Sequence, residues 1–270
     1  MSVFCKQIVN RLNLSKMHFA GKVVLITGAS SGIGATTAKV FAGLGAALAL
    51  TGRNLENLQQ VASDCASGTT PLLIIAELTS ESDTKAIIDQ TVERFGRLDV
   101  LVNNAAVLEL DSMETTSLAQ YDNVMNTNVR SLYHITTLAV PHLIKTKGNI
   151  VNVSSVTGLR AFSGLLTYSM SKAAVDQFTR CAALDLAPKQ VRVNSVNPGV
   201  IVTNFQRRAG MNREQYTEFL KRSEGNHALG RNGRAEEVAR AIVFLASDDA
   251  SFITGTTLPV DGGRHAMCPR

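Results

Sequence analysis

Short apolar runs alternate with longer amphipathic segments along most of the chain, beginning at residue 22. The first run, Val23-Val24-Leu25-Ile26, is followed by a Gly/Ser turn and is typical of a strand buried on both faces. The same pattern predicts strands at residues 46–51, 72–76, 100–103, 149–153, 191–196 and 257–260. Helical spacing predicts helices between the strands, at residues 32–43, 55–66, 82–95, 118–145, 167–187 and 235–247.

This alternation of strands and helices predicts an α/β fold, in which a doubly wound parallel sheet carries helices on both faces. Sheets of this kind bind their ligands beyond the carboxyl ends of the strands. The residues that follow each predicted strand are therefore the candidates for binding and chemistry.

The composition favours one domain rather than two. The 270 residues are 45% hydrophobic and 18% charged, with six prolines and no Ser/Gly/Pro-rich linker. We expect a single domain over residues 19–270 and a flexible extension over residues 1–18. Residues 1–16 carry Lys6, Arg11 and Lys16 and no acidic residue, so a mitochondrial transit peptide is the alternative interpretation of the extension.

The net charge of +5 and the pI near 9.1 do not indicate a nucleic-acid partner. The basic residues are scattered, and the pairs Arg207-Arg208 and Lys221-Arg222 are too short to track a phosphate backbone. A modest positive charge suits an anionic small molecule equally well. No apolar run reaches about 18 residues without polar interruption, so no membrane span is expected.

The four cysteines, Cys5, Cys65, Cys181 and Cys268, lie far apart and lack metal-ligand spacing. Cys65 and Cys181 fall in helical patterns, where a free thiol is usually buried. Free thiols fit a reducing compartment, so we expect a cytoplasmic protein. The histidines do not cluster either, and no metal site is expected.

A glycine-rich segment, Thr27-Gly28-Ala29-Ser30-Ser31-Gly32-Ile33-Gly34, joins the first predicted strand to the first predicted helix. Its glycines permit a tight turn and a close approach of the backbone to a pyrophosphate. The helix N-terminus offers free N–H groups and a positive dipole to phosphates. The context predicts a dinucleotide site, and hence a Rossmann-type sheet.

The end of the second predicted strand is expected to meet the adenosine ribose. An acidic residue there would select NAD(H), but the chain has Gly52-Arg53-Asn54. A guanidinium is a suitable partner for a 2′-phosphate. Arg53 therefore favours NADP(H), with NAD(H) as the alternative if Arg53 only begins a solvated helix.

Asn103-Asn104-Ala105-Ala106 ends the fourth predicted strand, Ser154-Ser155 ends the fifth, and Tyr168-Ser169-Met170-Ser171-Lys172 opens the following helix. Later motifs are Pro198-Gly199 with Thr203, and Asp261-Gly262-Gly263. In this order and spacing, together with the glycine loop, they resemble the single-domain branch of the short-chain dehydrogenase/reductase family. The resemblance runs from about residue 21 to residue 263 and implies a dinucleotide-binding, catalytic domain. The set is specific, although each motif alone is weak.

The resemblance implies that Asn128, Ser155, Tyr168 and Lys172 are catalytic. Ser155 is preferred to Ser154 because it lies thirteen residues before Tyr168. The positions that match the family's cofactor-binding residues are Gly28, Ser30, Ser31, Gly32, Ile33, Gly34, Arg53, Asn54, Glu77, Leu78, Asn104, Ala105, Tyr168, Lys172, Pro198, Gly199, Val200, Ile201 and Thr203.

The chain departs from the family pattern at two cofactor positions. It has Ala106 where glycine is usual, and Glu77 where aspartate is common. Both changes are conservative and concern cofactor affinity rather than the chemistry.

Tyr168 and Lys172 are one helical turn apart, so both side chains are expected on one face of the helix. A phenol with an ordinary pKa near 10 exchanges protons poorly at neutral pH. A nearby ammonium and the oxidised nicotinamide would lower the pKa of Tyr168. The resemblance implies that Tyr168 protonates the substrate oxygen, that Ser155 donates a hydrogen bond to it, and that Asn128 anchors a water of a proton relay through Lys172.

The substrate region is the least informative part of the sequence. The resemblance places a mobile lid at residues 204–228, where apolar and basic residues alternate. A steroid-, terpenoid- or xenobiotic-like carbonyl or alcohol fits this composition, although the apolar stripe is equally consistent with a packed helix. The expected substrate-contacting residues are Ser155, Tyr168, Leu159, Leu165 and Phe205, with Phe162 nearby.

Two other functions remain open at this point. One is a 3-oxoacyl-thioester reductase, which would need a basic surface for a phosphopantetheine carrier. The other is a redox-sensing protein that binds the cofactor with little turnover. The resemblance also implies a homo-oligomer, with a tetramer favoured. Helices 118–145 and 167–187 would form the contacts between its subunits.

Overall fold

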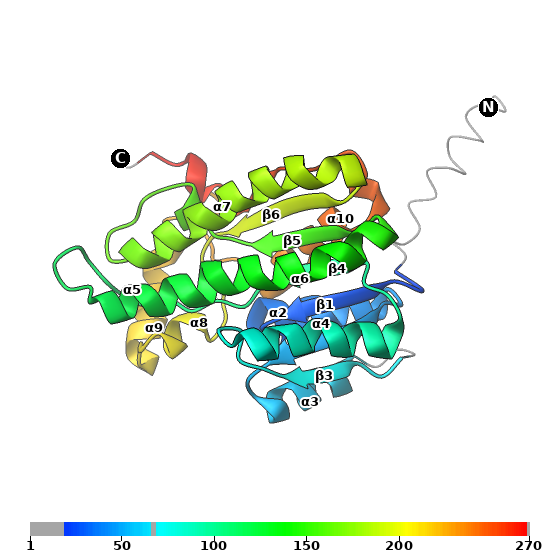
Figure 1. Ribbon diagram of the computed structural model, residues 1–270. Helices are drawn as coiled ribbons and strands as arrows, with labels where there is room; N and C mark the ends of the chain where they lie inside the picture. Colours follow the sequence, from blue (N-terminus) through cyan, green and yellow to red (C-terminus); the bar gives the residue numbers. More distant parts are fainter. Residues whose placement is uncertain (1–18, 66–68, 269–270) are drawn as a thin grey trace, which may run out of the picture.

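The computed structural model describes residues 19–65 and 69–268. Seven strands in this part of the chain form one parallel sheet, in the order β3-β2-β1-β4-β5-β6-β7 (Figure 1). The strands are β1 Val23–Thr27, β2 Ala47–Gly52, β3 Leu72–Ile75, β4 Val100–Asn103, β5 Asn149–Val153, β6 Arg192–Pro198 and β7 Thr257–Val260. The predicted fold class, a doubly wound Rossmann-type sheet, is confirmed.

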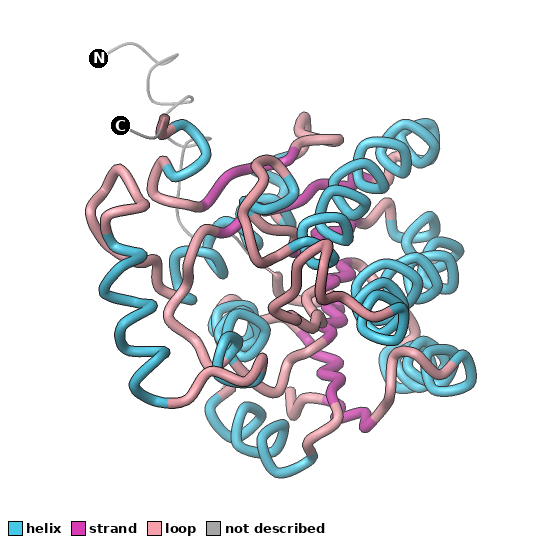
Figure 2. Tube along the Cα trace, turned by 90° about the vertical axis from the view of Figure 1, so that its left-hand side faces the viewer, coloured by secondary structure: helices cyan, strands magenta, loops and turns pink. Residues whose placement is uncertain are grey.

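Helices cover both faces of the sheet, which Figure 2 shows nearly edge-on. The longer helices are α2 Gly32–Gly43, α3 Leu55–Asp64, α4 Glu81–Phe95, α5 Leu118–Met125, α6 Ser131–Thr146, α7 Leu166–Leu186, α9 Arg213–Glu224 and α10 Ala235–Ala246. Short turns are α8 Phe205–Arg208, the π-helix η1 Asn126–Arg130, and the 3-10 helices η2 Val156–Gly158, η3 Ala187–Lys189, η4 Asp248–Ala250 and η5 Arg264–Ala266.

Alternate residues of β1 enter two separate apolar cores, which explains why the strand is apolar throughout. Val24 and Ile26 pack with residues of α2, α3 and α10 on one face. Val23 and Leu25 pack with residues of α4, α6 and α7 on the other. A strand covered on both faces buries every side chain, so it has no polar alternation.

Most predicted elements begin and end within two residues of the observed ones. The exception is the predicted helix at residues 118–145, which the structure divides into α5, η1 and α6. The π-turn spans only five residues, which is too short for apolar periodicity to reveal it. The prediction that Cys181 is buried is also wrong, because its side chain lies on the exposed side of α7. Cys65 is buried as expected.

The sheet order changes direction between β1 and β4, where successive crossovers leave on opposite sides. Asn104, directly after β4, ties the two strand ends together. Its Nδ2 donates to the carbonyl oxygens of Thr27 at 2.9 Å and Gly28 at 3.1 Å. Ligands bind at such a switch point because the loops there diverge and leave a crevice.

The predicted extension at residues 1–18 lies outside the described residues. Among the helices that the structure describes, none has the length and apolar composition needed to cross a bilayer.

Candidate active site

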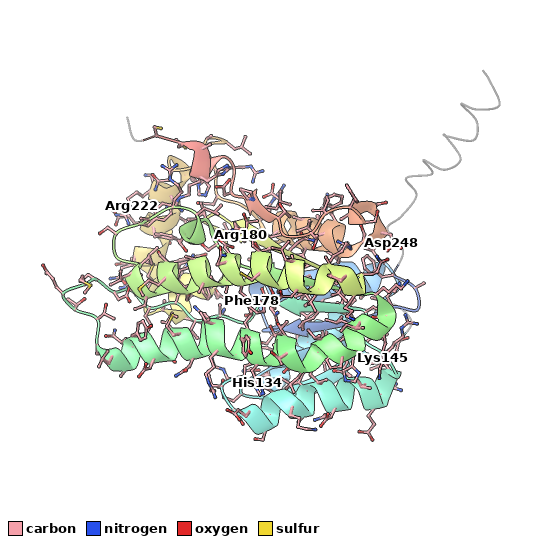
Figure 3. The ribbon with its side chains drawn as sticks, turned by 45° about the horizontal axis from the view of Figure 1, so that its top comes forward. His134, Lys145, Phe178, Arg180, Arg222 and Asp248 are labelled. Atoms are coloured by element: carbon pink, nitrogen blue, oxygen red, sulfur yellow. The ribbon has the colours of Figure 1, made fainter. Side chains whose placement is uncertain are left out.

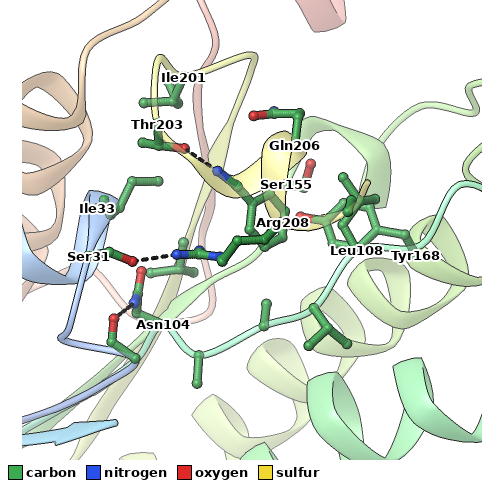
Figure 4. Close-up of a pocket in the computed structure, with 18 of the residues that line it drawn as sticks. Ser31, Ile33, Asn104, Leu108, Ser155, Tyr168, Ile201, Thr203, Gln206 and Arg208 are labelled. Carbon is green, nitrogen blue, oxygen red and sulfur yellow. Dashed lines mark hydrogen bonds between the residues drawn. The ribbon is translucent and has the colours of Figure 1, made fainter. Parts of the chain in front are cut away.

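A cavity of about 540 Å³ opens at the carboxyl edge of the sheet, along the loops that follow β1, β2, β4, β5 and β6 (Figure 4). Its walls include most of the predicted cofactor-binding residues, although these are spread from Gly28 to Thr203 in the chain. The two exceptions among the predicted binding and catalytic positions are Gly34 and Asn128, which lie behind the wall.

The glycine loop forms one end of the cavity. Gly28 and Gly32 adopt positive φ angles of 62° and 57°, which glycine adopts without strain. Gly34 serves packing instead, because a Cβ there would lie 2.4 Å from the Gly28 carbonyl oxygen and 2.5 Å from Asn104 Nδ2. The Ser31 side chain does not cap helix α2, so the helix N-terminus keeps its free N–H groups for a ligand.

Arg53 and Glu77 face each other at the adenosine end. Arg53 Nη1 lies 3.3 Å from Glu77 Oε2, and both side chains are exposed. Asn54 points away from this pair, because its side chain caps α3 by accepting from Asn57 N at 2.8 Å. Asn54 also lines the cavity, as do Glu77 and Leu78.

Arg208 is a residue of this end that the sequence reasoning did not assign. It comes from α8 in the predicted lid, and its Nη1 donates to Ser31 Oγ at 2.6 Å (Figure 4). Burial first, and the positive charge of Arg53 second, lower the pKa of Arg208. Two guanidinium groups therefore lie close together beside the glycine loop. The basic pair Arg207-Arg208 was the available signal, but only the fold brings Arg208 to Ser31.

Ser155, Tyr168 and Lys172 meet at the opposite end of the cavity. Ser155 follows β5 and caps the short helix η2, its Oγ accepting from Thr157 N at 3.1 Å. Tyr168 and Lys172 lie on the first turns of α7 and are 8% and 3% exposed. Lys172 Nζ donates to the Val153 carbonyl at 2.8 Å and lies 5.6 Å from the centre of the Tyr168 ring.

Burial dominates the electrostatics of this pair. It raises the pKa of Tyr168, and a hydrogen bond with Ser155 lowers that pKa only in part. Burial also lowers the pKa of Lys172 to about 8, against the opposing charge of Asp176. The expected lowering of the Tyr168 pKa by Lys172 is therefore absent in the protein alone. The reason is that both groups lose their hydration, and each loss favours the neutral form.

Asp176 is a second residue that the sequence reasoning did not assign. It lies one turn after Lys172 on α7 and is 1% exposed. Its carboxylate accepts hydrogen bonds from Asn197 Nδ2 at 2.8 Å and Ser195 Oγ at 3.3 Å, both on β6. An acidic residue at this spacing in a buried helix was the available signal.

Asn128 lies in the π-helix behind the cavity and is 1% exposed. Its Oδ1 accepts from Val107 N at 2.8 Å. Its Nδ2 donates to the Val107 carbonyl at 2.9 Å and to Ser171 Oγ at 3.0 Å. The side chain therefore joins the loop after β4 to helix α7, and both of its amide hydrogens are used within the protein.

The segment after β6 closes the cavity between its two ends. Pro198, Gly199, Val200, Ile201 and Thr203 all line it. His227 supports this segment, because its Nε2 accepts from Val200 N at 3.1 Å. The His227 ring is buried, and burial lowers its pKa.

Apolar side chains surround Tyr168 at the substrate end. Phe205 lies 6.0 Å from the Tyr168 ring, centre to centre. The prediction for Leu159 is wrong, because this side chain points to solvent outside the cavity. Of the Ser155–Tyr168 segment, only residues 155–157, 165 and 168 line the cavity. The apolar lining residues of this region are Leu108, Leu110, Leu165, Phe205, Met211 and Phe219.

Three polar atoms of cavity-lining residues are buried and have no hydrogen-bond partner within the described residues. They are Thr157 Oγ1 on η2, Gln206 Oε1 on α8 and Arg264 Nε on η5. Buried polar atoms are rarely left without partners in folded proteins. Such atoms on a cavity wall are suited to meeting polar groups of a bound ligand.

Comparisons with known proteins agree with this geometry. A family model described as enoyl-(acyl carrier protein) reductase matches residues 28–265. The 3-oxoacyl-[acyl-carrier-protein] reductase FabG of Thermotoga maritima is 37% identical over 252 residues, which cover 92% of this chain and 99% of that protein. Cyclopentanol dehydrogenase of Comamonas testosteroni is 39% identical over 247 residues, covering 91% and 97%.

A solved structure shows the same fold. A short-chain dehydrogenase/reductase of unknown function from Caenorhabditis elegans, crystallised with cofactor, superposes with a TM-score of 0.87 at 38% identity. The match covers 93% of this chain and 97% of that one. The chain belongs to the short-chain dehydrogenase/reductase family. Like its named relatives, this short-chain dehydrogenase/reductase is an oxidoreductase that acts on CH–OH groups with a nicotinamide dinucleotide.

The walls of this enzyme's cavity fit such a dinucleotide. The glycine loop leaves the backbone accessible beside Gly28 and Gly32, and α2 directs its N-terminus there. Arg53 and Arg208 supply positive charge at the same end. Within the described residues, no cluster of His, Cys, Asp or Glu could hold a metal ion.

Proposed function

We propose that this enzyme interconverts a carbonyl and a secondary alcohol on a lipophilic small molecule, using NADP(H). The observation that carries the proposal is a single cavity with Ser155, Tyr168 and Lys172 at one end and two arginines beside a glycine loop at the other. A dinucleotide bound at the glycine loop would bring its reactive ring next to Tyr168, because residues of both ends line the same cavity.

Tyr168 would protonate the carbonyl oxygen during reduction and accept the proton during oxidation. A bound nicotinamide would supply or accept the hydride at the reacting carbon. Ser155 accepts a hydrogen bond from Thr157 N and lies beside the Tyr168 hydroxyl, so its own hydroxyl would turn to donate to the same substrate oxygen when a substrate binds. The raised pKa of Tyr168 keeps the phenol protonated, as the reductive direction requires.

When Lys172 is protonated, its positive charge would favour the phenolate form of Tyr168. Lys172 would also hold the nicotinamide ribose. Asn128 acts as a positioning residue in this proposal, because it joins the loop after β4 to the helix that carries the tyrosine. Both side-chain amide hydrogens of Asn128 are already donated, so a relay water could bind this residue only at an acceptor oxygen.

The preference for NADP(H) rests on Arg53 and Arg208. Arg208 lies beside Ser31 of the glycine loop and Arg53 lies near Arg208, so a 2′-phosphate there would find two forked donors. No acidic residue stands at Gly52-Arg53-Asn54, where one would bind the ribose hydroxyls, and this disfavours NAD(H) in this proposal.

A lipophilic substrate is supported by the aromatic and aliphatic walls around Tyr168, which include Leu165, Phe205 and Phe219. The cyclopentanol dehydrogenase among the relatives acts on a small alicyclic alcohol. Burial of such a ring against these walls would contribute about 25 cal/mol per Å² of apolar area.

The test is a carbonyl panel followed by NADPH absorbance, repeated with NADH and with two variants. Tyr168→Phe should lose about 100-fold or more of its activity and still bind NADPH, because only the proton donor is removed. Arg53→Ala should raise the KM for NADPH about 10- to 100-fold and leave NADH use unchanged. Equal use of NADPH and NADH by the unaltered enzyme would contradict the assignment of Arg53.

A second candidate is a 3-oxoacyl-thioester reductase, the activity named for the Thermotoga maritima relative. Lys221 and Arg222 on α9 give the lid a basic edge that could meet a carrier protein. This candidate predicts rapid reduction of acetoacetyl thioesters, and much slower reduction of simple ketones. The opposite order supports the lipophilic small molecule.

We propose further that the protein is a cytoplasmic homotetramer. Tyr133 on α6 and Leu184 on α7 are 58% and 77% exposed. Between these helices lies an apolar depression lined by Met125, Val129, Tyr133, Val175 and Phe178, among others. Exposed apolar areas of this kind usually mark interfaces. The free thiols of Cys65, Cys181 and Cys268 favour the cytoplasm; the mitochondrial alternative depends on residues 1–16, which lie outside the described residues.

A further inference from the structure

Arg264 is a cation at the substrate end of the cavity that the proposed chemistry does not use. It lines the cavity from η5, just after β7. Its guanidinium carbon lies 4.4 Å from the ring centre of Phe162, which belongs to the segment between Ser155 and Tyr168. Phe162 itself does not line the cavity, so Arg264 reaches the wall between this segment and the one after β6, whose Val200 is held by the nearby His227.

The guanidinium of Arg264 has no anionic partner of its own. Its Nε is buried without an acceptor, and in residues 19–65 and 69–268 its side chain makes no hydrogen bond or ion pair. Asp261 is the nearby carboxylate whose charge acts on Arg264, but it is already engaged. It accepts from Gly263 N at 3.0 Å, His265 N at 2.7 Å and His265 Nδ1 at 2.9 Å.

Enclosing a charged N–H group without an acceptor is unfavourable. The contact with Phe162 explains where the guanidinium lies, but it leaves the Nε hydrogen unsatisfied. A ligand that enters the cavity and brings an anion would remove this cost. A carboxylate matches the fork of a guanidinium better than any neutral acceptor does.

We propose that Arg264 binds a carboxylate of the substrate, so that the enzyme acts on hydroxy or keto acids with an apolar body. The inference rests on the proposed function, because it takes Tyr168 as the place where the reacting oxygen binds. Leu165, Phe205 and Met211 line the cavity and would hold the apolar body between the two polar ends. Gln206 Oε1, also buried and without a partner among the described residues, is a further acceptor on the same wall.

The experiment compares keto acids with their methyl esters, which differ in charge but hardly in shape. The panel contains 4-oxocyclohexanecarboxylate and straight-chain oxo acids of increasing length, each with its ester, and NADPH as reductant. The unaltered enzyme should prefer at least one acid over its ester by about 10- to 100-fold in kcat/KM, as a charge-assisted pair provides. Arg264→Met should abolish this preference and leave turnover of the ester within about threefold.

Two further variants test whether Arg264 contacts the carboxylate directly. They distinguish this contact from long-range attraction by positive charge and from a structural role of Arg264. Arg207→Met removes one positive charge from exposed lid helix α8, and its side chain does not line the cavity, so the acid preference should persist. Arg264→Lys keeps the charge but loses the fork, and should retain part of the preference. A fall in NADPH affinity of Arg264→Met, with acids and esters slowed equally, would instead assign Arg264 to the cofactor and overturn the inference.

The experiment also distinguishes failure of the carboxylate subsite from failure of the proposed carbonyl reductase activity. Turnover of esters and neutral ketones, with no acid preferred, upholds the carbonyl reductase and refutes the carboxylate subsite. If no ketone is reduced, calorimetric titration of the same acids into NADPH-loaded enzyme decides the matter. Binding of an acid that is lost in Arg264→Met sustains the inference, and no binding overturns it.

Discussion

Lys172 is the residue on which burial has the largest functional consequence. It is 3% exposed, and burial holds its pKa at about 8 rather than the ordinary 10.5. Near neutral pH it is therefore a cation close to its own titration, held by the Val153 carbonyl. A lysine in this state supplies charge to Tyr168 and also exchanges protons readily, which a proton relay needs.

The pKa of Lys172 predicts a pH dependence of stability. Between pH 8 and 10.5 the unfolded chain binds more protons at this residue than the folded one, so rising pH favours folding. The cost of the buried cation is complete below about pH 8 and is relieved above it. From pH 7 to 9.5, below the ordinary pKa of Tyr168, the unaltered protein should gain about 2 kcal/mol of unfolding free energy relative to Lys172→Met.

Urea unfolding of both proteins at the two pH values measures this difference. Asp176 lies beside Lys172 and keeps its hydrogen bonds from Asn197 and Ser195 at both pH values. Its contribution to the difference in unfolding free energy is therefore expected to be about the same at pH 7 and pH 9.5. A difference between the two proteins that stays the same at pH 7 and 9.5 would show that Lys172 titrates at its ordinary value.

At the scale of elements, the π-helix η1 interrupts what would otherwise be one long helix from α5 to α6. The wider turn carries Asn128 toward Val107 and Ser171, which makes three hydrogen bonds between separate segments. Single π-turns of this kind are frequent at functional sites. Here the irregular turn sets the position of the loop after β4, which forms part of the cavity wall.

Asn128→Ala should lower the free energy of unfolding by about 2 kcal/mol, because the Val107 N–H and C=O would lose their partners in a buried region. It should also lower kcat more than it raises KM, since the loop and α7 lose their alignment. Asn126→Ala, an exposed position in the same turn, is the matched control and should change stability by less than about 0.5 kcal/mol. Equal effects of the two changes would contradict a positioning role for Asn128.

Helix α2 offers a second comparison within one element. Gly34→Ala would force a Cβ to 2.4 Å from the Gly28 carbonyl oxygen and should displace the glycine loop. We expect a loss of about 2 kcal/mol of stability and at least tenfold weaker NADPH binding. Gly43→Ala, where nothing lies within 4 Å of the added Cβ, should be neutral or stabilise by up to about 1 kcal/mol. Calorimetric unfolding and NADPH fluorescence titration measure both, and unchanged NADPH affinity in Gly34→Ala would contradict the expectation.

For the whole molecule, the face formed by α5, α6 and α7 is the candidate interface between copies of the chain. Figure 3 looks onto these helices and shows Phe178 in the groove between α6 and α7. Its ring lies 6.3 Å from that of Tyr133, which is largely exposed. Two helices that present aromatic rings to solvent are suited to pack against the same two helices of a second copy across a twofold axis. A tetramer with such axes can be described as a dimer of dimers.

Tyr133→Glu should therefore reduce the proposed tetramer to smaller species in sedimentation velocity, because it buries a charge at the interface. Leu55→Glu, at an exposed apolar position on α3, introduces the same charge on a different part of the surface and should leave the assembly intact. A monomeric unaltered protein, or a tetramer that tolerates Tyr133→Glu, would refute this interface.

The sequence by itself predicted the order of elements, their approximate bounds, the dinucleotide loop and the meeting of Ser155, Tyr168 and Lys172. These features are local or periodic: buried strands are apolar throughout, Gly28 and Gly32 mark a turn, and residues four apart share a helix face. The order of the motifs along the chain predicted that they lie at one site, because the carboxyl ends of parallel strands share one edge of the sheet.

Only the tertiary structure decided features that depend on contacts between distant segments. Arg208 meets Ser31 across 177 positions, Arg264 reaches the cavity from beyond the last strand, and Leu159 turns away from it. Burial also reverses the expected direction of the Tyr168 pKa. Sequence spacing carries no information on hydration or on which loops touch, and those two quantities determine the charge states and the walls of this site.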